Sequence, residues 1–414
     1  MVGVMLLAMF WRRQPVGIAL FLGAVAGTLV NGDGLPVRHL VEGAFTYFDP
    51  ILIIFTALLF MRVIQENGAL ESLTWQIVSR FGDKPALLLS IVTLFIMLPA
   101  MLTGISTTSV LTTGGLIAVP LIALGIPRIN VAAMIIMVSI MGMIAPPINL
   151  IAMLIGQGVD MPYIGFEGPL ALLAFPLAFL SAFGLGYRHL GRIKPEEALA
   201  GLPKPNLDTG NAGLYLAPVT VLSLMALVRI FPQFVPDIGI PLIFMIGALI
   251  GLFTGRKTNF FKSAYGSLLT ALPVLGLLAG IGIFLQIMTL TGVRGLLVVT
   301  VLSFPVALTY LGMMVSLPVF GGVSAFASAM VFGIPFLLSL LGRNEIVVCA
   351  GISLLAGLGD VLPPSAIGAR FAAQVAGEPS FMAVVKKCLP WVLVSAAAAL
   401  AMVYFAQRLT FLVP

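Results

Sequence analysis

Hydrophobic residues fill most of this chain, in stretches that reach the roughly 17 to 25 residues a helix needs to cross a bilayer. These stretches lie near residues 14–31, 50–65, 130–157, 168–187, 213–231, 236–255, 267–290, 295–315, 345–375 and 389–411. Two others, 85–125 and 303–341, are too long for one span and contain Gly, Ser and Pro, so part of each is expected to be a re-entrant hairpin. The pattern predicts an all-α polytopic membrane protein with about 10–12 spans.

Two segments depart from this pattern. Residues 1–11 are apolar but short and are not followed by a small-residue cleavage pattern, which favours a short or kinked first helix over a cleaved signal peptide. A start codon assigned too late would give the same pattern. Residues 67–84 alternate apolar and polar side chains at helical spacing, which predicts a bracing arm that lies along the membrane interface.

A doubled proline occurs twice inside long apolar sequence, at Pro146-Pro147 and at Pro363-Pro364. Proline removes a backbone donor and clashes with the preceding turn, so each pair is expected to break a membrane helix. A single offset of 217 residues superimposes the two pairs and several other positions. The chain is therefore interpreted as an internal duplication. The other matched pairs are Gly104 with Gly321, Gly125 with Gly342, Gly142 with Gly359, Gln157 with Gln374 and Pro162 with Pro379.

Loop charges indicate how the two halves enter the membrane, since short loops rich in Lys and Arg stay cytoplasmic. The segment before Pro50 is acidic, whereas the segment before Pro273 carries Arg256, Lys257 and Lys262. The halves therefore enter from opposite sides, as in carriers with inverted repeats. The predicted parts are N-terminal scaffold helices (1–49), repeat 1 (50–190), a cytoplasmic linker (191–212), further scaffold helices (213–266) and inverted repeat 2 (267–414).

Composition excludes several classes of protein. With 60% hydrophobic and 9% charged residues the chain is not a soluble domain, which would carry about 25% charged residues. The net charge of +6 is explained by the cytoplasmic loops, so no nucleic-acid partner is inferred. There is no phosphate-binding Gly-Lys-Ser/Thr loop and no catalytic constellation, which argues against an ATP-driven machine or an enzyme. No cofactor is predicted.

Hydroxyl side chains cluster upstream of each proline pair, from Gly104 to Thr113 and from Gly321 to Ser328. Hydroxyls beside unwound carbonyls suit a hard cation such as Na⁺, and the amides freed at half-helix starts suit a carboxylate. The same small residues also line ordinary helix contacts in membranes. The candidate Na⁺ ligands are Ser106, Thr107, Gly142, Pro146, Gly322, Gly359 and Asp360. The candidate substrate-binding residues are Thr108, Asn149, Gln157, Ser324, Ser365, Arg370 and Gln374.

Asp360 and Arg370 are ionisable residues inside a predicted span, and such residues are costly there unless they are paired or hydrated. Asp360 could ligate a cation, carry a proton or cap the following half-helix. Arg370 could clamp a substrate carboxylate, pair with Asp360 or reach a lipid headgroup.

These motifs resemble the large membrane subunit of tripartite ATP-independent periplasmic transporters, from Asp49-Pro50 through the Gly104 cluster to Gly377-Glu-Pro379. The resemblance implies an elevator carrier with two hairpins and two broken helices. It also implies a small four-helix membrane subunit and a periplasmic solute-binding protein as partners. Two features depart from the family: Gly104-Ile-Ser106-Thr107 replaces a Gly-Ser-Ser type signature, and Asp360 precedes the second proline pair.

The predicted function is import of a small organic anion across a bacterial inner membrane, driven by a Na⁺ gradient and fed by a periplasmic binding protein, with H⁺ as the alternative coupling ion. A single-component symporter of the same superfamily remains an alternative. A channel would need charge rings or a filter and is disfavoured, and so is a membrane scaffold without transport activity.

Overall fold

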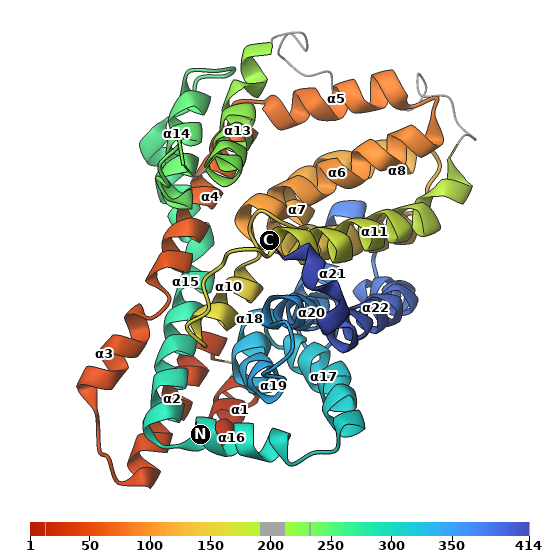
Figure 1. Cartoon of the computed structure of the whole chain (residues 1–414). Coiled ribbons are helices and arrows are strands. Elements are labelled where there is room, and N and C mark those ends of the chain that lie inside the picture. The colour runs from red at the N-terminus through yellow and green to blue at the C-terminus, as the bar shows by residue number, and fades with distance from the viewer. Residues whose placement is uncertain (13, 191–211, 232, 414) are drawn as a thin grey trace.

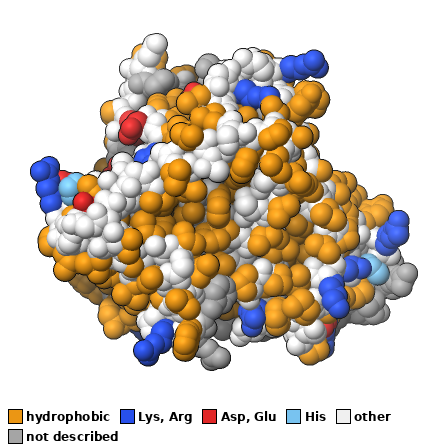
Figure 2. All heavy atoms as spheres, turned by 90° about the horizontal axis from the view of Figure 1, so that it is seen from below, with side chains coloured by type: hydrophobic (Ala, Val, Ile, Leu, Met, Phe, Trp, Pro, Cys, Tyr) orange, Lys and Arg blue, Asp and Glu red, His pale blue; other side chains and the backbone are white. Residues whose placement is uncertain are grey.

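The computed structural model describes residues 1–12, 14–190, 212–231 and 233–413, and in these ranges the fold is all-helical (Figure 1). Seven of the described helices are long and apolar enough to cross a membrane, and several shorter apolar helices accompany them. Figure 2 shows hydrophobic side chains over much of one face, with most lysines and arginines near its outline. The structure thus confirms the predicted all-α polytopic class.

The helices follow one another as two similar series. Before the first series lie α1 (Val2–Phe10), α2 (Val16–Asn31) and α3 (Val37–Phe45). The first series is α4 (Phe48–Glu66), α5 (Ala69–Phe81), α6 (Pro85–Thr103), α7 (Ser106–Ser109), the π-helical η1 (Val110–Gly114), α8 (Gly115–Ala123), α9 (Arg128–Ile144), α10 (Leu150–Gln157) and α11 (Glu167–Gly186). Then come η2 (Tyr187–His189), η3 (Ala212–Tyr215), α13 (Leu216–Ile230) and α14 (Ile240–Leu252).

The second series repeats the order of the first. It comprises α15 (Phe260–Leu290), α16 (Val293–Leu302), α17 (Val306–Gly321), α18 (Ala325–Ser328), the π-helical η4 (Ala329–Gly333), α19 (Ile334–Ser339), α20 (Glu345–Gly357) with η5 (Leu358–Val361), α21 (Ile367–Ala376) and α22 (Phe381–Tyr404), followed by η6 (Ala406–Leu412). It starts before the predicted boundary at 267. The division into domains stays a prediction.

The arm helices α5 and α16 show the relative direction of the two series. Each follows a glycine with positive φ, Gly68 at 89° and Gly292 at 72°, which lets the chain turn sharply out of the preceding long helix. Figure 1 shows α5 at one end of the molecule and α16 at the other, while α4 and α15 pack together. The two series therefore have opposite orientations.

Both proline pairs interrupt their helices, as the sequence predicts. α9 ends at Ile144 and α10 begins at Leu150, whereas η5 ends at Val361 and α21 begins at Ile367. The same turn closes both broken ends. The Ala145 N–H donates to the Gly142 carbonyl at 3.2 Å, and the Leu362 N–H donates to the Gly359 carbonyl at 2.8 Å.

One predicted span is wrong. The stretch 295–315 is not one helix, because α16 ends at Leu302 and α17 begins at Val306. Pro305 has no backbone N–H and disfavours a helical conformation in the residue before it, so the chain turns there. The segment 1–11 does form a short helix, α1, and the predicted interface helix in 67–84 is α5. The linker 191–212 lies outside the described residues except for Ala212.

Two packing regions position the candidate site. α2, α3 and α4 lie along α15, where small residues allow close approach: a Cβ on Gly43 would lie 2.7 Å from the Ile283 Cα. In the other region α9 is buried along almost its whole length and contacts α6, α11, α21 and α22. α9 thus forms the centre of a bundle that holds both proline breaks.

An ion pair joins the basic loop before α15 to the arm helix α5. Arg256, in the loop between α14 and α15, forms an ion pair of 2.8 Å with Glu71 on α5. The basic loop before α15 therefore lies beside α5, the helix that carries Arg80 (Figure 1).

Candidate functional site

The tip of the first hairpin lies against the first break. Gly104 ends α6 with a φ of 65°, Ile105 is extended, and Ser106 begins the short helix α7. A Cβ on Gly104 would clash with the side chain of Leu150, the first residue of α10. This close approach places the hydroxyls of Ser106, Thr107 and Thr108 at the tip.

The hydroxyls behind the tip stabilise the hairpin itself. Pro99 lies inside α6 and has no backbone N–H, and Ser109 and Thr113 bind backbone groups on either side of it. The Ala100 N–H donates to Ser109 Oγ at 2.7 Å, and Thr113 Oγ1 donates to the Ile96 carbonyl at 3.4 Å. These two side chains therefore have a structural role.

The second hairpin repeats this arrangement. α17 contains Pro318, and Ser328 Oγ donates to the Leu317 carbonyl at 2.7 Å. Ser324 instead caps α18 and accepts a hydrogen bond from the Ala327 N–H at 3.3 Å. Part of each hydroxyl cluster thus serves helix packing, the second of the two interpretations that the sequence allows.

A hydrogen bond connects the tip of the first hairpin to the second break. Ser106 Oγ donates to Asp360 Oδ2 at 2.5 Å, across 254 residues of sequence. Ser106 is fully buried, and Asp360 lies in η5, just before the prolines. In the described ranges Asp360 has no cationic side chain within ion-pair distance. The site thus contains a carboxylate that forms no ion pair in the described ranges.

The second break packs tightly against the second hairpin. A Cβ on Gly359 would lie 2.5 Å from the carbonyl oxygen of Gly321, and one on Gly321 would lie 2.5 Å from that of Ala356. The Gly322 carbonyl accepts hydrogen bonds from both the Ser365 N–H, at 3.0 Å, and the Ser365 hydroxyl. The two candidate residues Gly322 and Ser365 are therefore joined by hydrogen bonds.

Arg370 does not pair with Asp360, so that alternative is wrong. Its Nε donates to the Ser365 carbonyl at 2.7 Å, and its guanidinium carbon lies 4.0 Å from the centre of the Phe381 ring. The side chain is exposed, as is Gln374 one turn further along α21. Its terminal nitrogens have no hydrogen bond within the part of the chain that the structure describes.

Asn149 organises the first break. Its Oδ1 accepts from the Ala152 N–H at 3.0 Å and so caps α10, while Nδ2 donates to the Ile144 carbonyl at 3.2 Å and to Ser353 Oγ at 2.9 Å. The Asn149 N–H donates to the Tyr163 hydroxyl at 3.0 Å. Sequence reasoning missed Ser353 and Tyr163, because a lone hydroxyl in an apolar stretch resembles an ordinary packing residue.

The segment after α10 contacts the helices outside this bundle. Gln157 Nε2 donates to the Thr46 carbonyl at 2.7 Å, and Arg294 donates to the Gly158 carbonyl. Arg229 on α13 forms an ion pair with Glu167, and it donates to the Tyr163 carbonyl at 3.2 Å. Gln157 thus contacts a residue outside the bundle, whereas its predicted counterpart Gln374 lies on α21, within it. The roles of all candidate residues as ligands stay predictions.

Residues 3–408 match the family model described as "Tripartite ATP-independent periplasmic transporter, DctM component". The chain belongs to the DctM family. No curated protein matches it in sequence. As a DctM protein, the chain is a membrane component of a tripartite transporter and not an enzyme.

Two solved transporter structures share the fold of this DctM protein. The Alcanivorax borkumensis YdaH transporter aligns with a TM-score of 0.65 and 16% identity, over 96% of this chain and 99% of that chain. Neisseria gonorrhoeae MtrF aligns with a TM-score of 0.64 and 17% identity, over 91% of this chain and 85% of that chain. MtrF is described as representing a class of antimetabolite efflux pumps. At this identity the likeness shows the fold alone.

Proposed function

We propose that this DctM protein imports a small organic anion across a bacterial cytoplasmic membrane, coupled to Na⁺. It would receive the anion from a periplasmic solute-binding protein and work with a small four-helix membrane subunit. The tripartite family supports the partners. The broken helices of two oppositely oriented series support a secondary carrier, because such breaks form substrate and ion sites near the membrane centre.

The observation that carries the cation coupling is the Asp360 carboxylate. A charged group inside a membrane protein is costly unless something neutralises it. Asp360 accepts a hydrogen bond from Ser106 and has no basic partner in the described ranges. Carboxylate and hydroxyl oxygens are the donors that hard cations prefer. A Na⁺ held by Asp360, Ser106 and the neighbouring Thr107 would supply the missing charge.

The anion site is proposed beside the second break. The Nε of Arg370 donates a hydrogen bond to the Ser365 carbonyl, which leaves the two terminal nitrogens available to a carboxylate. Phe381 stacks on the guanidinium and restricts its orientation. Because Asp360 and Arg370 stand on either side of the same proline pair, a bound cation and a bound anion would lie close enough to favour each other electrostatically.

The transport step is proposed to be a sliding of the bundle around α9 against the frame formed by α2, α3, α4 and α15. Gln157 contacts Thr46 of this frame. Gly158 contacts Arg294 on the neighbouring helix α16, and Glu167 contacts Arg229 on α13; these contacts hold the present position. Each of these contacts is a single hydrogen bond or a half-exposed ion pair, so each can exchange for another without a large energetic barrier.

The experiment is uptake into proteoliposomes that contain this chain and its membrane partner, with the binding protein loaded with its anion outside. Uptake is expected with an inward Na⁺ gradient and not with an equal K⁺ gradient. Asp360→Asn should retain uptake only at raised Na⁺, whereas the control Asp237→Asn, in an exposed loop, should behave as the original protein. Uptake that follows a proton gradient and ignores Na⁺ would reject the proposed coupling.

A further inference from the structure

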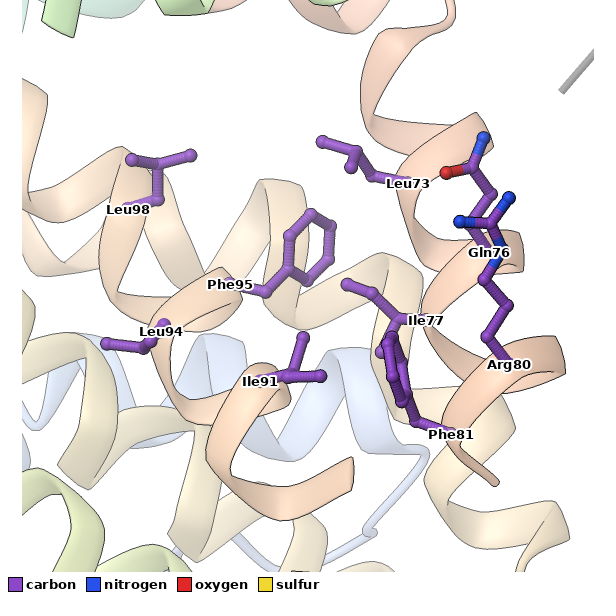
Figure 3. A pocket seen from close by; sticks show the side chains of 9 residues that line it. All are labelled: Leu73, Gln76, Ile77, Arg80, Phe81, Ile91, Leu94, Phe95 and Leu98. Atoms are coloured by element: carbon purple, nitrogen blue, oxygen red, sulfur yellow. The ribbon is translucent and has the colours of Figure 1, made fainter. Parts of the chain in front are cut away.

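An apolar groove lies between the arm helix α5 and the hairpin helix α6 (Figure 3). Its volume is about 380 Å³. Side chains from the facing surfaces of the two helices line it, including Leu73, Ile77 and Phe81 from α5 and Leu94, Phe95 and Leu98 from α6. The lining offers almost no hydrogen-bonding groups, so the groove does not suit water or a polar solute.

A cationic side chain stands at the edge of the groove. Arg80 follows Ile77 and Gln76 on α5, and Figure 3 shows its guanidinium on the outer side of that helix. Arg80 is exposed, and in the described ranges it forms no ion pair. Lys84 adds a second exposed cation one turn later, beside Asp83. The groove therefore combines an apolar interior with an excess of positive charge at its edge.

The position of the groove identifies its surroundings. α5 lies at one end of the molecule, roughly across the long axes of α4 and α15, as expected of a helix in the plane of the membrane interface (Figure 1). α6 exposes Leu87 and Leu94, at 42% and 45%, on a helix long and apolar enough to cross the membrane. The exposed leucines beside the groove therefore suit contact with acyl chains, and the Arg80 edge suits contact with headgroups.

We propose that this groove binds one anionic phospholipid, with an acyl chain between α5 and α6 and its phosphate on Arg80. Arg binds phosphate oxygens with paired hydrogen bonds, and anionic lipids are concentrated where cytoplasmic basic residues face the membrane. The lipid would fill the space between the arm and the hairpin that carries Ser106. It would therefore be a structural ligand of the carrier, distinct from the transported anion.

The test is native mass spectrometry of the purified, delipidated full chain titrated with phosphatidylglycerol, with phosphatidylcholine of the same acyl chains, or with inorganic phosphate. We expect one phosphatidylglycerol to be retained more strongly than phosphatidylcholine, and millimolar phosphate not to displace it. Arg80→Gln should weaken phosphatidylglycerol binding about fivefold. Leu94→Trp should abolish the specific adduct, because the larger side chain fills the groove.

Matched controls separate the groove from general effects. Lys257→Gln removes an exposed cation elsewhere at the same end, and Leu87→Trp enlarges an exposed leucine of α6 that does not line the groove. Both should bind phosphatidylglycerol as the original protein does. Equal binding of the two lipids by the original chain, displacement by phosphate, unchanged binding by both groove variants, or no adduct at all would each overturn the proposal. The comparison of lipids on the original chain does not depend on the folding of any variant.

Discussion

Replacing Gly359 by alanine tests the contact that positions Asp360. A Cβ at this position would lie 2.5 Å from the carbonyl oxygen of Gly321, and closer still to the carbonyl carbon, whereas ordinary contact begins at 3.4 Å. The carbonyl carbon of Gly321 would lie 2.0 Å from the Cβ, so the second hairpin would have to move away from the break by about 1.4 Å. Both groups are backbone, so no side-chain rotation can relieve the clash. Overpacking of this kind costs about 1–3 kcal/mol.

The displacement also acts on the neighbouring carboxylate. Asp360 is the next residue, and its hydrogen bond to Ser106 is already short at 2.5 Å, so a shift of the break should lengthen or misalign it. We therefore expect Gly359→Ala to lower the midpoint of thermal unfolding by about 2 °C or more. It should also raise the Na⁺ concentration needed for half-maximal uptake.

The assay pairs thermal unfolding in detergent with uptake in proteoliposomes. The control is Gly295→Ala on the arm helix α16, where a Cβ would meet nothing within 4 Å. That change should be neutral or stabilising by about 0.5–1 kcal/mol, because alanine is the better helix former. If Gly359→Ala unfolds at the original temperature and keeps the original Na⁺ dependence, the close packing does not position Asp360.

Three further variants separate structural from ligand roles. Ser109→Ala should lower the thermal midpoint by leaving the Ala100 N–H without its partner, at a cost of about 1–3 kcal/mol, while the Na⁺ dependence of uptake stays unchanged. Ser106→Ala should raise the Na⁺ concentration needed for half-maximal uptake and change the thermal midpoint little. Equal effects of the two serine variants on both quantities would contradict this assignment of roles. Arg229→Gln breaks a half-exposed ion pair with Glu167 that is worth less than about 1 kcal/mol, so the uptake rate should change less than about fivefold. Complete loss of uptake would show that Arg229 does more than hold the bundle in its present position.

Local sequence features predicted much of the fold. Pro146-Pro147 and Pro363-Pro364 identified the breaks because the effect of proline on a helix is local and strong. Hydrophobic length identified α2, α4, α11 and α13 for a similar reason. The same criterion predicted one span where the structure has two helices, α16 and α17, because hydrophobicity alone does not indicate the turn before Pro305.

The candidate site was only partly predictable. Asp360 stood out as an acid in an apolar stretch, but its partner Ser106 is 254 residues away, and nothing local selects it among the neighbouring hydroxyls. The different roles of Ser106 and Ser109 depend on which distant groups the fold brings beside them, the Asp360 carboxylate and the Ala100 N–H, and this is a tertiary property. Ser353 carries no sequence signal, because its bond to Asn149 arises only when α20 packs beside the first break.

Equilibrium binding of radioactive Na⁺ to the purified chain, compared between the original protein and Asp360→Asn, addresses the cation site most directly. Saturable binding that excess unlabelled Na⁺ displaces and K⁺ does not is predicted for the original protein. The asparagine variant, which keeps the size and one oxygen but loses the charge, should bind at least about tenfold more weakly. Equal binding by the two proteins would contradict a Na⁺ site at Asp360.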